Sequence, residues 1–129
     1  MKKTLFIPYQ MAILAKQKGF NEPCLAFFTG NNEQIQIDDS FVTTNSQLTR
    51  IHKIRTRGGE VERLLIAAPI YQQLIDWFRQ THKIYIYVTV GSEYLQIWGV
   101  FTNYEAKKGY DVDYYEALTH ALNAAFELI

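Results

Sequence analysis

The sequence predicts a single α+β domain over residues 1–129, in which an antiparallel, hairpin-rich sheet is packed by about three helices. Two glycine-containing hairpin turns and three segments with helical spacing lead to this expectation. Of the 129 residues, 48% are hydrophobic and 20% are charged. This composition supplies a core for one compact domain and excludes an intrinsically disordered protein.

The first helix is expected over residues 8–18. Pro8 suits the first helical position, because its missing N–H would be unpaired there, and Gly19 can adopt the left-handed conformation that closes a helix. Pro23 then ends any helical run, and the apolar residues 24–28 predict a buried strand.

The clearest local signal is a hairpin turn at Gly58-Gly59, which joins strands near 49–57 and 60–67. Pairing outward from this turn sets opposite charges across the ladder at two places, Arg57 with Glu60 and Arg55 with Glu62. Such pairs stabilise a hairpin by about 0.2–1 kcal/mol each.

A second hairpin over residues 84–102 is expected to turn at Gly91-Ser92. Pairing outward from it gives one apolar face, formed by Ile86, Val88, Leu95 and Ile97. Because side chains alternate along a strand, the opposite face then carries the aromatic residues Tyr85, Tyr87, Tyr94 and Trp98.

Two further helices are predicted. Pro69 opens one that runs to about Gln80, and Asp113 caps another that runs to the C-terminus, with Glu116 three positions on. The apolar stripe of the last helix contains Leu118, Leu122 and Phe126.

Cytoplasmic localisation and no membrane association are expected. Pro8 interrupts the apolar run after Met1 too early for a secretory signal, and no stretch approaches the ~20 apolar residues of a membrane span. Cys24 is the only cysteine, so no intramolecular disulfide is expected.

The sequence offers no catalytic, metal or cofactor motif, so the protein is not expected to be an enzyme. His52, His82 and His120 have no ligand at a metal-binding spacing. Cys24 begins an apolar strand and is interpreted as a core residue. Phosphate-binding glycine loops and the nucleophile elbow are absent.

Two surfaces are candidates for binding. The first is the basic hairpin with Lys53, Arg55 and Arg57, although the formal net charge is +0 and gives no global attraction to nucleic acid. The alternative is an ordinary solvated hairpin whose ion pairs set its register. The second is the aromatic face of the 84–102 hairpin. The alternative for this face is that its rings are buried and form part of the core.

Four blocks of the sequence carry a family resemblance. They are Ile7-Pro8-Tyr9, the run from Gly19 to Cys24, the run from Ala68 to Arg79, and Tyr115-Glu116-Ala117. In order and spacing they resemble uncharacterised small proteins encoded by phages and mobile elements of the Bacteroidetes. The segment from Gly30 to Arg63 departs from this pattern. The resemblance implies a phage or mobile-element origin and a bacterial host cytoplasm, and it carries no function.

These observations favour a non-enzymatic accessory protein that binds a host or phage protein and self-associates through the aromatic face as a homo-oligomer. The alternative is a nucleotide or nucleic-acid binder. It would hold phosphates with Lys53, Arg55 and Arg57 and stack bases on the aromatic hairpin.

Overall fold

The computed structural model describes residues 2–29, 34–37, 42–49, 52–63 and 65–129, and gives the backbone alone at 49, 52–56 and 60–63. It confirms the α+β class, with three α-helices and antiparallel strands joined by hairpins. The strands of the described residues form three sheets. The chain divides into two compact units, unit 1 (residues 1–70) and unit 2 (residues 71–129).

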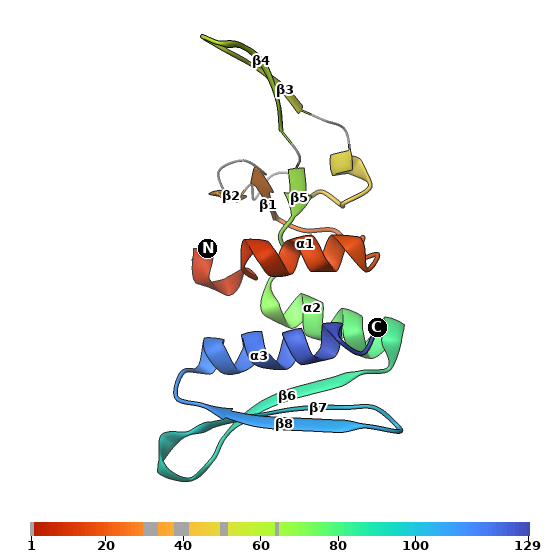
Figure 1. Cartoon of the computed structure of the whole chain (residues 1–129), viewed down its shortest axis with the longest axis vertical. Helices are drawn as coiled ribbons and strands as arrows, with labels where there is room; N and C mark the ends of the chain where they lie inside the picture. The colour runs from red at the N-terminus through yellow and green to blue at the C-terminus, as the bar shows by residue number, and fades with distance from the viewer. Residues whose placement is uncertain (1, 30–33, 38–41, 50–51, 64) are drawn as a thin grey trace. The chain divides into compact units, whose positions relative to one another are not determined.

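Unit 1 contains the three-stranded antiparallel sheet β2-β1-β5, against which α1 packs (Figure 1). Its elements are α1 (Tyr9–Gln17), β1 (Ala26–Thr29), β2 (Gln34–Ile37) and β5 (Leu65–Ala67), with 3₁₀ turns at Lys3–Leu5 and Gln47–Thr49. The predicted first helix is confirmed within one residue at each end, since Pro8 precedes it and Gly19 follows with φ +92°.

A buried asparagine ties unit 1 together. Asn45 is 4% exposed, and its side-chain amide donates to the carbonyl of Phe20 at 2.8 Å. Its Oδ1 accepts from the backbone N–H of Ala67 at 2.9 Å. One side chain therefore joins the segment that follows α1 to β5, and nothing in the hydrophobic pattern predicts this role.

The basic hairpin exists, but the predicted turn is wrong by one residue. Strands β3 (His52–Thr56) and β4 (Gly59–Arg63) pair with Thr56 opposite Gly59, so the turn residues are Arg57 and Gly58. Only the second glycine has a positive φ, +112° at Gly59, as in a turn that is followed by a left-handed glycine.

The register of the basic hairpin shifts accordingly. The opposed residues are Arg55 with Glu60 and Lys53 with Glu62, instead of Arg57 with Glu60 and Arg55 with Glu62. Residues of opposite charge are still paired in the register, because the shift moves one strand by two residues and keeps its faces. The strand predicted over 60–67 is divided between β4 and β5, which belong to different sheets.

Unit 2 is a three-stranded antiparallel sheet in the order β6-β7-β8 with α3 along one face (Figure 1). Its elements are α2 (Tyr71–Trp77), a π-helical turn (Phe78–His82), β6 (Tyr85–Val90), β7 (Gln96–Phe101), β8 (Ala106–Asp111) and α3 (Tyr114–Phe126). Strand β8 was not predicted, because Ala-Lys-Lys-Gly-Tyr-Asp shows no apolar alternation.

The predicted turn of the second hairpin is also wrong. The loop between β6 and β7 spans residues 91–95 and is closed by the Gly91 N–H, which donates to the Leu95 carbonyl at 2.7 Å. The positive φ values fall on Glu93 (58°) and Tyr94 (64°), where the sequence has no glycine to indicate them. The longer loop places Tyr87 opposite Gly99 and Val88 opposite Trp98.

The last helix follows its prediction closely. Asp113 caps it, since Oδ2 accepts from the Glu116 N–H at 3.0 Å. The predicted core stripe is confirmed, with Leu118, Leu122 and Phe126 exposed by 3%, 0% and 4%. The ring of Phe126 packs edge-on against Phe78, with centroids 4.9 Å apart.

Candidate binding surface

The two faces of the β6-β7-β8 sheet have different environments. The inner face lies against α3, because the Asp111 carboxylate accepts from His120 Nδ1 at 2.7 Å and Lys107 binds Glu127 at 3.0 Å. Val100, which lies on this face in the central strand β7, is 1% exposed. The outer face has no helix against it within unit 2 (Figure 1).

Four large aromatic side chains lie exposed on the outer face. They are Tyr85, Tyr87, Phe101 and Tyr110, exposed by 37%, 36%, 42% and 69%. Residues that are directly opposed in neighbouring strands share a face of the sheet. Tyr85 is opposed to Phe101, and Tyr110 is opposed to Ile97, which in turn is opposed to Thr89. Thr89 lies on the same side of β6 as Tyr85 and Tyr87, because side chains alternate along a strand. We call these four residues the outer aromatic face.

The rings of the outer aromatic face support one another. Tyr85 and Phe101 are stacked, with centroids 5.1 Å apart and planes 17° apart, and Tyr87 lies 6.4 Å from Phe101. The ring of Tyr87 covers Gly99, where a Cβ atom would collide with it. The stacked rings of Tyr85 and Phe101 thus restrict each other before any partner binds, which lowers the entropic cost of binding.

The outer face carries little charge. Its only charged residue is Lys108, which lies in one row with Gly99 and Tyr87 across the three strands. A mostly apolar face without carboxylates suits a partner that covers it with apolar or aromatic groups.

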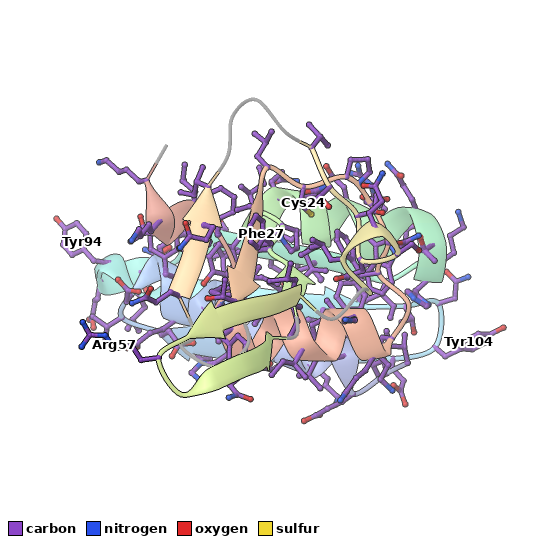
Figure 2. The ribbon with its side chains drawn as sticks, turned by 90° about the horizontal axis from the view of Figure 1, so that it is seen from above. Cys24, Phe27, Arg57, Tyr94 and Tyr104 are labelled. Carbon is purple, nitrogen blue, oxygen red and sulfur yellow. The ribbon has the colours of Figure 1, made fainter. Side chains whose placement is uncertain are left out.

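The structure brings together only part of the predicted aromatic surface. Tyr85 and Tyr87 lie on the outer face as predicted. Trp98 does not, because the longer 91–95 loop turns it to the inner face with Val88. Tyr94 lies in that loop, 88% exposed (Figure 2). Phe101 and Tyr110 were missed, and the unpredicted strand β8 supplies the second of them.

The basic hairpin lies in the other unit. Arg57 is exposed at its turn (Figure 2), and Lys53 and Arg55 occupy β3 opposite Glu62 and Glu60. The side chains of Lys53 and Arg55 lie outside the described part of the chain. Anion binding by these three residues stays a prediction.

The structure shows the surroundings of Cys24, His82 and His120, the residues considered for catalysis. Burial, with a contribution from Glu22, raises the pKa of the Cys24 thiol to about 12, so it remains protonated and unreactive at neutral pH. Burial lowers the pKa of His82, whose ring lies edge-on to Trp77 at 4.8 Å. His120 is engaged by Asp111. Within the described residues, no group of three His, Cys, Asp or Glu residues is placed to hold a metal.

Two glycines provide a matched test of the two sheet faces. Gly109→Ala should cost about 1–3 kcal/mol of unfolding free energy, because its Cβ meets the Trp98 ring on the helix-covered face. Gly99→Ala should cost less than about 1 kcal/mol, since the Tyr87 ring that it meets can swing into solvent. Urea unfolding of both variants measures the difference, and equal losses would contradict this assignment of faces.

Comparison with models of protein families, with curated proteins and with solved structures gives no match for this chain. Among the described helices, none combines the length and apolar character needed to cross a membrane.

Proposed function

We propose that this chain is a non-enzymatic binding protein that holds a protein partner on its outer aromatic face. The observation that carries the proposal is the gathering of four exposed aromatic side chains on one open sheet face. Contiguous exposed apolar surface is unusual on a monomeric protein and tends to mark a binding site. Tyrosine and tryptophan anchors dominate the binding energy of many protein interfaces.

The partner we propose is a host or phage protein in the bacterial cytoplasm, in line with the origin that the sequence resemblance implies. In this role the chain acts as an accessory factor of a phage or mobile element. Self-association through the same face is the competing outcome of the experiment below.

The test removes two tyrosines from the outer face and compares them with two tyrosines elsewhere. Tyr87→Ala with Tyr110→Ala should weaken capture of the partner at least about 30-fold, because truncating one aromatic hot spot at the centre of an interface costs about 2 kcal/mol or more. Affinity capture from infected or element-carrying cells, quantified by mass spectrometry, measures the loss. Circular dichroism melting checks that the variant still folds.

The matched control is Tyr94→Ala with Tyr104→Ala, which removes the same atoms from loop positions that are 88% and 95% exposed (Figure 2). Capture by this control should equal that of the unmodified protein. Equal capture by both double variants would refute the binding role of the face. If the outer variant loses only self-association, the face is a homo-oligomer contact.

A nucleotide or single-stranded nucleic acid is the second candidate ligand, and the row of Tyr87, Gly99 and Lys108 favours it. A ring that stacks on a base beside a cation that meets phosphate is the usual arrangement of such sites. Lys108→Glu should then abolish binding of a fluorescent oligonucleotide, and binding to the unmodified protein should weaken as salt is raised. Capture of a protein partner should survive the same substitution.

A further inference from the structure

The two edges of the β6-β7-β8 sheet differ in composition. Strand β8, at one edge, contains two lysines, a glycine and an aspartate. Strand β6, at the other, reads Tyr-Ile-Tyr-Val-Thr-Val and contains no charged residue, glycine or proline. Lysine side chains on an edge strand, and residues that interrupt the strand, prevent it from pairing with another chain. Strand β8 has this protection, and β6 lacks it.

The hydrogen-bond pattern shows which groups of β6 face outward. Gly91 donates to Leu95 at 2.7 Å, so this pair is hydrogen-bonded, and alternation along the ladder makes Tyr85, Tyr87 and Thr89 the residues that bond to β7. The N–H and C=O groups of Ile86, Val88 and Val90 therefore point away from β7. Three residues of strong β propensity therefore present their backbone at an edge that no strand of the described residues pairs with.

We propose that two copies of this chain pair through β6, edge to edge and antiparallel, to form a continuous six-stranded sheet. The twofold axis passes beside Val88, so that Val88 of one copy faces Val88 of the other and Ile86 faces Val90. This register uses all three outward residues in both copies. An isologous contact of this kind closes on itself and gives a dimer rather than a filament.

The side chains of this register are compatible with self-pairing. On the outer side Tyr87 of each copy lies beside Thr89 of the other, and aromatic residues next to β-branched ones stabilise neighbouring strands. No like charges are opposed across the twofold axis, because β6 contains no charged residue. This contact is separate from the proposed partner site, since it uses the strand edge and leaves the outer aromatic face of each copy available.

The first experiment measures mass against concentration by sedimentation equilibrium. The unmodified protein should rise from the monomer mass of 15.1 kDa to twice that value. Val88→Pro removes the central outward N–H but no bond to β7, and should keep the protein monomeric. Lys108→Pro is the matched control, because Thr102 N–H bonds to Glu105 at 2.8 Å and alternation points the Lys108 N–H away from β7.

The control should dimerise as the unmodified protein does. Dimerisation of Val88→Pro, or its loss in Lys108→Pro alone, would overturn the proposal. So would a dimer that only the double variant of Tyr87 and Tyr110 disrupts, which would place the contact on the outer face.

A second measurement needs no variant. Amide exchange by NMR should show protection of Ile86, Val88 and Val90 that increases with protein concentration, while Tyr85, Tyr87 and Thr89 are protected at every concentration. Fast exchange of the first three amides under conditions where the protein is concentrated would overturn the proposal, even if Val88→Pro fails to fold.

Discussion

Replacing Phe126 by alanine should lower the free energy of unfolding by about 3–5 kcal/mol. The ring is 4% exposed near the end of α3, and it packs edge-on against the fully buried Phe78. Truncation removes these contacts and leaves a cavity that the rigid surroundings fill only in part. Urea unfolding followed by circular dichroism measures the loss.

The control for Phe126 is Phe101→Ala, which removes the same atoms from the outer face, where the ring is 42% exposed. This variant should lose less than half as much stability, because part of its ring is already in water. A loss below about 1 kcal/mol for Phe126→Ala would show that α3 contributes little to the core of unit 2.

Replacing Asn45 by alanine should cost about 2–6 kcal/mol, although the residue is polar. The substitution takes away the donor to the Phe20 carbonyl and the acceptor of the Ala67 N–H, both at a buried site. Each buried polar group deprived of its partner costs about 1–3 kcal/mol. Thermal and urea unfolding of the full chain measure the effect.

Asn21→Ala is the matched control for Asn45. Asn21 also accepts from a backbone N–H, that of Ser46 at 2.7 Å, but at an exposed site where water replaces the lost partner. It should cost about 1 kcal/mol or less. Equal effects of the two substitutions would mean that the bonds of Asn45 are not isolated from water.

Local signals predicted the elements whose ends they mark. Pro8 and Gly19 gave the first helix, and the spacing of Asp113 and Glu116 gave the start of the last one, because capping depends on a few neighbouring residues. The core stripe of the last helix followed from its 3.6-residue period.

The register of the aromatic hairpin could not be predicted in this way. A turn centred on Gly91-Ser92 uses the residue best suited to positive φ, yet the structure assigns that conformation to Glu93 and Tyr94. As a result, the pairing of β6 with β7 differs from the predicted register by an odd number of residues. Such a shift exchanges the two faces of β7, so Trp98 lies on the inner face and Phe101 on the outer face. The candidate surface therefore depends on loop geometry that propensities do not encode, and on the lysine-containing strand β8.

The strand order of unit 1 has a consequence for how the chain acquires its structure. In unit 2 each strand pairs with the next one along the sequence, so only short loops must close. In unit 1, β1 pairs with β5, and Phe28 meets Ile66 from 38 positions away. High contact order slows folding. During synthesis the N-terminal sheet must wait for residue 67 to leave the ribosome, whereas each hairpin of the C-terminal meander can close as soon as its second strand emerges.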